Sequence, residues 1–193
     1  MALDALSDVS DEALLVLYAN GDPGAARALT LRLTPRVLGF AARMLSDRTE
    51  AEDVAQEAML RLWRMAPDWQ QGEARVATWL YRVASNLCLD RLRRSRPRGL
   101  DEVAEPEDAT PGVVARLIEA DRALALDEAL AALPDRQRQA VVLRHIEGLT
   151  NPEIAAVMDI GVEAVESLVA RGKKGLAALL SGRRAELGYE GEE

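Results

Sequence analysis

Apolar residues recur every three or four positions through most of the chain, and no segment alternates apolar and polar residues as a half-buried strand does. This pattern predicts helices and no strands. In the first half of the chain it predicts four helices, over about residues 11–20, 23–45, 49–65 and 75–96. The intervening segment APDWQQGEA, residues 66–74, is predicted to form a loop.

Capping and breaking residues set the expected ends of these helices. Ser10 and Asp11 begin the first helix, and Pro35 is expected to bend the second. Thr49 and Glu52 form a T-x-x-E pattern, which predicts a capping box at the start of the third helix.

The second half begins with the segment PRGLDEVAEPEDATPG, which has proline, glycine and clustered acids but no apolar period. Such a composition indicates a linker. A helical hairpin is predicted to follow from about Val113, with a break at Leu133 and Pro134.

A second T-x-x-E pattern, Thr150 with Glu153, predicts another capping box, and Pro152 lies in the first helical turn, where proline is tolerated. Gly161 separates this short helix from a longer apolar-periodic one. A short helix, a tight turn and a second helix are typical of a helix-turn-helix, although other helical hairpins share the pattern.

The predicted fold class is therefore all-α, with two small helical domains joined by a flexible linker, the second containing the helix-turn-helix. The predicted boundaries are 1–98, 99–119 and 120–193. With such a linker, we expect little surface to hold the two domains together.

Composition supports helices and excludes several kinds of site. Aromatic residues make up 4% of the 193 residues, so the core must be built from Leu, Ala and Val. Cys88 and His145 are single, so neither an intramolecular disulfide nor a zinc site is expected. We predict no catalytic residues, metal or cofactor, an inert buried Cys88 and a structural His145. With no signal-peptide pattern or long apolar run, we expect a cytoplasmic protein without membrane contact of its own.

Charge is distributed unevenly along this acidic chain of formal net charge −8. Residues 82–98 carry six arginines and one acid, whereas residues 99–110 carry five acids and no base. A second basic stretch covers residues 171–184. Two basic patches separated by acids predict two contact sites for a polyanion.

The third predicted helix has two different faces. Val54, Ala58, Leu62 and Met65 form a core stripe. The opposite face joins carboxylates to Leu60 and Trp63, which indicates either a protein partner with basic and apolar surface or, for Trp63, a place in the core.

Two tryptophans lie close in sequence to the arginine cluster. Aromatic rings beside cations can stack on unpaired bases while the cations bind phosphates. The alternative is that both are core anchors. This fits Trp79, which has Leu80, Val83 and Leu87 nearby, better than Trp69 in its polar loop.

Three motifs in order give a resemblance over about residues 11–180. These motifs are similar to those of bacterial extracytoplasmic-function (ECF) sigma factors. They are AEDVAQEAMLRLWR, ATWLYRVASNLCLDRLRR, and LPDRQRQAVVLRHIEGLTNPEIAAVMDI with GVEAVESLVARGKKGL. The resemblance implies a transcription factor that binds the β′ clamp and β flap of core RNA polymerase, directs initiation at promoter DNA, and is held by an anti-sigma factor.

The resemblance also implies three sets of contact residues. The set for core polymerase is Asp53, Gln56, Glu57, Leu60 and Trp63. The set for the −10 element is Trp69, Arg75, Trp79, Arg82, Asn86, Arg91, Arg93 and Arg94. The set for the −35 element is Thr150, Asn151, Glu163, Ser167, Arg171, Lys173 and Lys174.

Two departures from the family pattern and three rival functions bear on this interpretation. Val76 stands where an aromatic residue is common, and Glu163 and Glu166 stand where small or basic residues are common.

The rivals are an ordinary helix-turn-helix regulator, a sigma mimic that sequesters an anti-sigma factor, and an enzyme. The first would not need the Asp53–Trp63 face, the second is normally fused to a receiver domain, and the third lacks a site.

Overall fold

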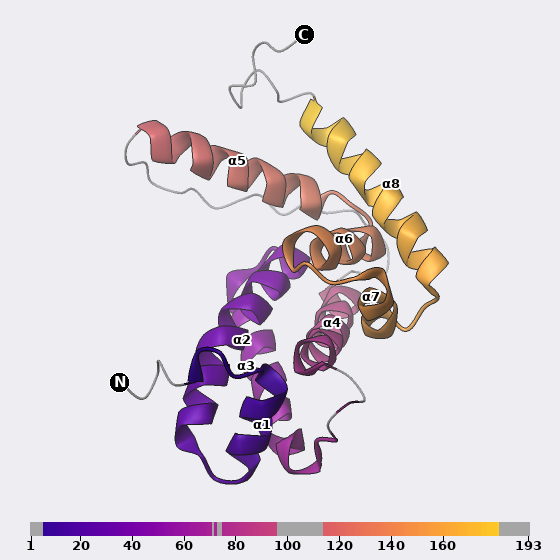
Figure 1. Ribbon diagram of the computed structural model, residues 1–193. Helices are drawn as coiled ribbons and strands as arrows, with labels where there is room; N and C mark the ends of the chain where they lie inside the picture. The colour runs from indigo at the N-terminus through magenta and orange to yellow at the C-terminus, as the bar shows by residue number, and fades with distance from the viewer. Residues whose placement is uncertain (1–5, 71, 73–74, 96–113, 182–193) are drawn as a thin grey trace.

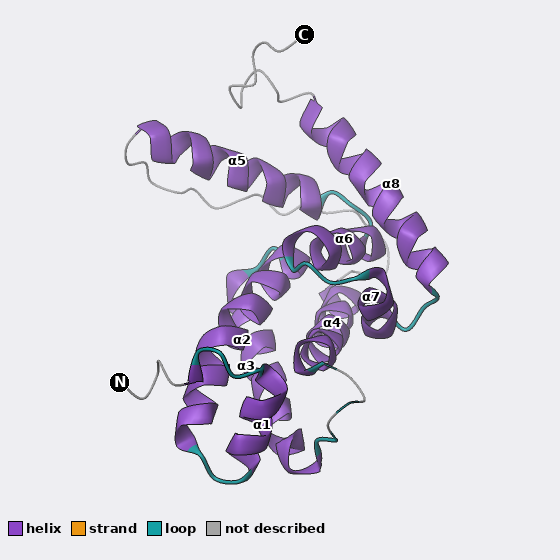
Figure 2. Ribbon diagram, viewed as in Figure 1, coloured by secondary structure: helices purple, strands orange, loops and turns teal. Residues whose placement is uncertain are grey.

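The computed structural model describes residues 6–70, 72, 75–95 and 114–181, and all regular structure in these ranges is helical (Figures 1 and 2). In chain order the elements are α1 (Asp11–Ala19), α2 (Pro23–Leu45), α3 (Arg48–Met65), the 3₁₀ turn η2 (Ala66–Asp68), α4 (Val76–Ser95), α5 (Val114–Ala131), α6 (Asp135–Val141), the π-helical segment η3 (Val142–Ile146), α7 (Asn151–Met158) and α8 (Val162–Ser181). The all-α prediction of two domains, the second with a helix-turn-helix, is confirmed. Most of the predicted linker lies outside the described residues, and α5 begins within its last part.

The first domain comprises α1–α4, with α2 packed against the other three helices (Figure 1). Its core is built from apolar stripes with the period of a helix, such as Leu29, Leu33, Val37 and Phe40 along α2. The ring of Phe40 meets that of Tyr81 from α4 edge to face, with centroids 5.5 Å apart. Such a pair adds about 0.5–1.5 kcal/mol to the free energy of unfolding beyond its buried area.

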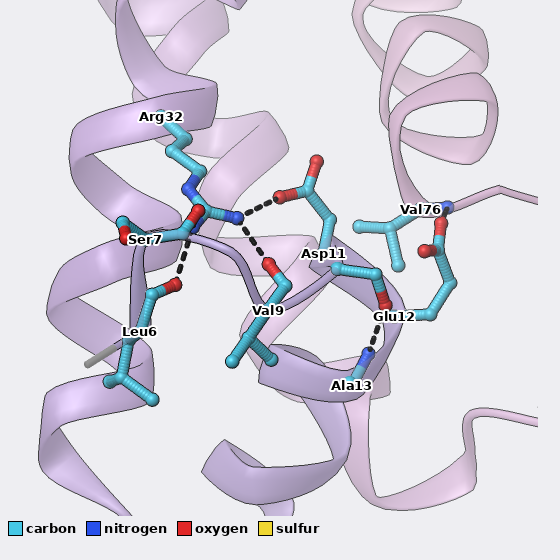
Figure 3. A network of polar contacts seen from close by, with 9 residues as sticks. Leu6, Ser7, Val9, Asp11, Glu12, Ala13, Arg32 and Val76 are labelled. Carbon is cyan, nitrogen blue, oxygen red and sulfur yellow. Dashed lines mark hydrogen bonds and ion pairs between the residues drawn. The ribbon is translucent and has the colours of Figure 1, made fainter. Parts of the chain in front are cut away.

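The segment before α1 is fastened to α2 by one arginine (Figure 3). The Arg32 guanidinium donates to the carbonyl oxygens of Leu6, Ser7 and Val9, each at 2.6 Å, and to the Asp11 carboxylate at 3.2 Å. One planar cation thus holds the short stretch of chain that precedes the first α-helix.

A carboxylate of α1 also caps α4. The Glu12 side chain accepts a hydrogen bond of 3.0 Å from the Val76 backbone N–H, which is one of the unpaired donors at the start of α4 (Figure 3). This contact ties the start of the arginine-rich helix to the N-terminal helix, 64 residues earlier in the chain.

The start of α3 differs from the prediction. Asp47 is the N-cap, and its side chain accepts from the Glu50 N–H at 3.0 Å. Thr49 lies inside the first turn, so the predicted Thr49–Glu52 capping box is wrong. Asp47 and Glu50 have the same three-residue spacing two positions earlier, and a carboxylate caps a helix as well as a hydroxyl does.

The second domain comprises α5–α8, with α6 and α7 enclosed between α8 and the first domain, and α5 and α8 extending beyond them (Figure 1). The predicted capping box is confirmed, because Thr150 and Glu153 bond reciprocally at the start of α7. Gly172 lets α8 approach α6 closely, since a β-carbon there would lie 2.4 Å from Cγ2 of Val141.

The two domains are packed together, contrary to the expectation of little shared surface. Helix α7 lies against α4, and α2 contacts α5, α6 and η3. Buried residues of both domains form one continuous core, in which Tyr81 from the first domain and Leu143 and Ile154 from the second are each at most 1% exposed. The linker composition could not reveal this packing, because the contacts join residues far apart in sequence.

Candidate protein and nucleic-acid interfaces

The outer face of α3 combines acids with an exposed leucine, as predicted. Asp53 and Gln56 are exposed, and Leu60 retains 41% of its surface. Glu57 is half-buried and forms an ion pair of 2.8 Å with Arg61 one turn later. The core stripe of Val54, Ala58 and Leu62 is buried on the opposite side.

Trp63 lies partly in the core and partly at the surface, so both interpretations of its spacing, a core residue and part of a partner-binding face, apply. It is half-buried against the core, and its ring is 4.6 Å from that of Tyr18 on α1. With Leu60, Met59 and Leu38 it also lines a mainly apolar hollow of about 380 Å³ between α2 and α3. Leu38 and Met59 were not predicted, since their spacing alone assigns them to the core.

A larger groove, of about 1050 Å³, separates the outer face of α3 from the end of α4. Asp53, Gln56, Glu57 and Leu60 line its α3 wall, and Arg91 and Arg94 line its α4 wall. The structure therefore places predicted polymerase-binding and phosphate-binding residues on facing walls. Within the groove, Arg91 pairs with Glu50 at 2.5 Å.

The predicted −10 residues on α4 fall into two groups. Arg82 and Asn86 are exposed one turn apart. Arg93 and Arg94 are exposed in the last turn, where Arg93 lies 3.6 Å from Asp90. Trp79 is half-buried against the core, as its apolar neighbourhood suggested.

Trp69 lies in less open surroundings than its polar loop suggested, and Arg75 is paired with a residue of the other domain. Trp69 is half-buried against the core, and its indole N–H is buried with no hydrogen-bond partner among the described residues. Arg75 remains 75% exposed at its side chain and forms an ion pair of 3.2 Å with Glu153 of the second domain.

The helix-turn-helix presents most of its predicted −35 residues to solvent. Glu163, Ser167, Arg171, Lys173 and Lys174 are exposed along α8. The Thr150 hydroxyl bonds to Glu153 at 2.7 Å within the capping box. The pKa of Glu153 is lowered mainly by the hydrogen bond from the Thr150 backbone N–H. The bond from the Thr150 hydroxyl and the Arg75 cation lower it further, whereas partial burial opposes the shift.

Asn151 at the start of α7 reaches α8, where its amide donates to Glu166 at 3.4 Å. The two line a shallow hollow of about 510 Å³ with Arg144 and Lys173. Arg144 was not predicted, and neither was an exposed position for His145. Desolvation by neighbouring groups, followed by the charges of Lys173 and Arg144, lowers the pKa of His145 and favours its neutral form.

The described residues offer no site for metal or thiol chemistry. They contain no group of three or more potential metal-ligating side chains. Cys88 is fully buried, and burial raises its pKa to about 12, which confirms the inert core position that its neighbours predicted. Among the same residues, no helix is long and apolar enough to cross a membrane.

Comparison with known proteins matches both domains. The family "Sigma-70 region 2" matches residues 29–98, and "Sigma-70, region 4" matches residues 123–176. The ECF RNA polymerase sigma factor SigM of Mycobacterium tuberculosis is 37% identical over 172 residues, which cover 89% of this chain and 85% of that protein.

Two solved structures are similar in fold. One is CnrH in complex with the cytosolic domain of CnrY, at 28% identity and a TM-score of 0.66, covering 89% of this chain and 97% of that one. The other is the sigma factor RpoE in complex with the anti-sigma factor NepR from Bartonella quintana, at 21% identity and a TM-score of 0.65, covering 80% of this chain and 96% of that one.

Proposed function

The chain belongs to the ECF group of RNA polymerase sigma factors, and on that premise we propose which of its surfaces bind polymerase, promoter and regulator. As a sigma factor it directs transcription initiation and is not an enzyme. We propose that the protein acts in the cytoplasm.

The core polymerase surface is the outer face of α3, which binds the β′ clamp, while the second domain binds the β flap. The single observation that supports the clamp assignment is an exposed Leu60 ringed by Asp53, Gln56 and Glu57. An apolar anchor surrounded by charge is the usual composition of a protein-binding patch. The adjacent hollow lined by Trp63 offers a pocket for an apolar side chain of the partner.

The test is the affinity for core polymerase of a variant carrying Asp53→Ala and Glu57→Ala. We expect at least about tenfold weaker binding, equivalent to about 1.4 kcal/mol. The matched control, Asp8→Ala with Asp68→Ala, removes the same charge from exposed positions in the same domain and should bind normally. Unchanged affinity of the first variant, with its helix content intact, would refute the assignment.

The −10 element is proposed to contact α4, with Asn86 and Arg82 at bases and the exposed arginines of the last turn at phosphates. Their exposure on one helix supports this division. Trp69 and Trp79 are half-buried and contribute through the part of each side chain that remains exposed, and Arg75 contributes once it is released from Glu153. Arg91 is proposed to bind phosphate in exchange for Glu50.

The −35 element is proposed to contact α8 through Glu163, Ser167, Arg171, Lys173 and Lys174, with Asn151 and Thr150 near the backbone at the start of α7. The exposed cations on α8 supply the electrostatic part of binding. Glu163 can accept a hydrogen bond from a cytosine amino group, which would favour C over other bases at one position.

An anti-sigma factor is proposed to regulate this chain by covering the α3 face. The structure of RpoE, which shares the fold, contains the anti-sigma factor NepR. Leu60 and its neighbours suit such a partner for the same reason that they suit polymerase. Since Cys88 is buried and inert, redox sensing would reside in the partner. A stable ternary complex with core polymerase and the cognate anti-sigma factor is incompatible with this steric competition.

A further inference from the structure

A hydrogen bond between side chains joins the two helices of the helix-turn-helix. The amide nitrogen of Asn151, the first residue of α7, donates to Oε1 of Glu166 in the second turn of α8 at 3.4 Å. The amide must present its nitrogen here, because its oxygen would set two acceptors against each other. The glutamate is therefore held by a residue of the neighbouring helix.

The start of α7 is a firm support for this bond. Thr150 and Glu153 close the capping box on either side of Asn151, with the Thr150 N–H donating to the Glu153 carboxylate at 2.8 Å. Pro152 follows in the same turn, and its ring fixes its φ angle. Asn151 is also half-buried. A glutamate held by such a residue has less freedom to lose on binding than an unsupported one.

Glu166 lies on the outer face of α8, near the start of the helix. It is exposed, whereas Val165 beside it is fully buried. Glu163 and Ala170, about one turn to either side, share this face and are exposed as well. In a helix-turn-helix, the N-terminal part of the second helix reaches base edges in the major groove. Glu166 therefore stands where a side chain reads a base, and the small Ala170 leaves room beside it.

One oxygen of this carboxylate is used within the protein and the other is free to bind. Among the described residues, Asn151 is the hydrogen-bond partner of Glu166 and bonds to Oε1, while no bond reaches Oε2. A carboxylate oxygen accepts a hydrogen bond from N4 of cytosine. Adenine places its N7 acceptor beside its amino group, and the major-groove edges of guanine and thymine present acceptors, which repel a carboxylate. The free oxygen thus suits cytosine best.

Nearby cations offset the repulsion between Glu166 and DNA phosphates. Arg144 of η3 and Lys173 of α8 line the same shallow hollow of about 510 Å³ as Glu166. Both are exposed, and within the described part of the chain neither forms an ion pair with an acid. Two cations and one carboxylate leave this region net positive. An acid can therefore be kept on the DNA-facing helix for its hydrogen bond without making the surface repel the phosphate backbone.

We propose that Glu166 selects cytosine at one position of the −35 element, and that Asn151 is the positioning residue that holds its carboxylate for this contact. The inference rests on the proposed function, in which α8 contacts that element. Glu163 lies about 4.5 Å nearer the start of α8, more than the rise of about 3.4 Å between base pairs, so it meets a different pair. Since no side-chain hydrogen bond supports Glu163 among the described residues, Glu166 is the more selective of the two.

The test is the base preference of the holoenzyme formed from the full chain and core polymerase. Promoter DNA randomised across both elements is bound, and the bound and free fractions are sequenced. The wild-type holoenzyme should favour cytosine over each other base by about tenfold at one −35 position. Glu166→Ala should reduce this preference to within about twofold at that position alone. Glu166→Gln should favour adenine there, because an amide pairs with N6 and N7 of that base.

The positioning role is tested by combining variants. Asn151→Ala should lower the cytosine preference to about threefold, and it should have no further effect on that preference in a chain that carries Glu166→Ala. A merely structural role of Asn151 would instead weaken binding equally in both backgrounds. Asp159→Asn is the charge control, because it removes an exposed acid outside α8 and asparagine tolerates the φ of 54° at this position. It should keep the tenfold preference.

Several outcomes would overturn the proposal. One is an unchanged cytosine preference in Glu166→Ala, including the case in which this variant binds all sequences more tightly because only repulsion was lost. An effect of Asn151→Ala that persists without Glu166 would overturn the positioning role. Should Glu166→Ala lose helix content, Glu166→Gln decides, and an unaltered preference again counts against the proposal. A −35 preference that does not depend on Glu166 leaves the proposed function standing, whereas no preference at any −35 position refutes both.

Discussion

A methyl group added at Gly172 should destabilise the second domain although it removes a glycine from a helix. Gly172 lies in the middle of α8, where it faces α6. A β-carbon there would lie 2.4 Å from Cγ2 of Val141 and 3.2 Å from the carbonyl oxygen of Gln137. Val141 is 3% exposed and β-branched, so its side chain has no alternative rotamer of similar energy.

Two opposing effects set the magnitude. Replacing a glycine inside a helix by alanine stabilises the helix by about 1 kcal/mol. Forcing a methyl group into a packed core costs about 1–3 kcal/mol. The steric effect is the larger for Gly172→Ala, because one contact is with a stiff side chain and the other with backbone. We expect a net loss of up to about 2 kcal/mol.

Gly175→Ala is the matched control on the same helix. A β-carbon there would lie 2.7 Å from Cδ2 of Leu133, which is the far end of a flexible side chain and can rotate away. The helix effect should then prevail, with a gain of up to about 1 kcal/mol. Calorimetry or urea unfolding of the full chain should show the two variants on opposite sides of wild type, with each 1 kcal/mol shifting Tm by about 2–4 °C. Equal stabilities would refute the assumption that the Val141 contact determines the outcome.

Three further results are expected. Arg32→Met removes four hydrogen bonds and should lower the protection of the chain before α1 by about 1–3 kcal/mol, measured by amide hydrogen exchange; unchanged protection would show that the segment is held by packing alone. Arg93→Ala should reduce the salt slope of promoter binding by the holoenzyme by about one without altering sequence preference; the reverse pattern would mean that Arg93 contacts bases. The pKa of Glu153 is lowered in the folded state, so its charge stabilises the protein above its unfolded-state pKa, and this stabilisation is lost as pH falls through the folded-state pKa. Glu153→Gln should therefore be less stable than wild type at pH 7 and approach it in acid, as followed by thermal unfolding, whereas a constant difference would assign the effect to packing.

Local signals were sufficient for most helix ends. The Thr150–Glu153 box needs only residues three apart, and the sequence pattern identified it correctly. The same rule failed at α3 because Asp47 offers a competing cap with the same spacing to Glu50. Two overlapping patterns of equal chemistry cannot be ranked without the backbone conformation that precedes them.

Contacts between the domains could not be predicted. Tyr81 and Glu147 are 66 residues apart, and Arg138 and Met44 are 94 apart. Arg138 stands among Asp135, Arg136 and Gln137, so its sequence context resembles a solvated helix face. Helical period assigns a residue to a face, but it does not say which other surface that face will meet.

Residue spacing distinguished exposed from buried positions for only some of the predicted contact residues. The exposed position of Leu60 followed from helical period, whereas Arg82 and Asn86, which are also exposed, were named from the family resemblance. The half-buried position of Trp69 did not follow from spacing, because a polar loop gave no sign that the ring would fold back onto the core. A single tryptophan in a short loop has enough apolar surface to overrule the polarity of its neighbours.

Because of the π-helical segment η3, deletion of a single codon there should change how the two domains contact each other. Its wide turn is closed by the Glu147 N–H bonding to the carbonyl of Val142, five residues earlier, where an α-helix would bond four residues earlier. That turn holds one residue more than an α-helical turn and so sets the direction in which Glu147 points. Deleting one codon between positions 142 and 146 would allow a regular helix and rotate the carboxylate by about 100° relative to Arg138, the step that 3.6 residues per turn implies. An in-frame loss of three nucleotides would thus remove the contacts of Glu147 with Tyr81 and Arg36 while leaving all three residues in the gene.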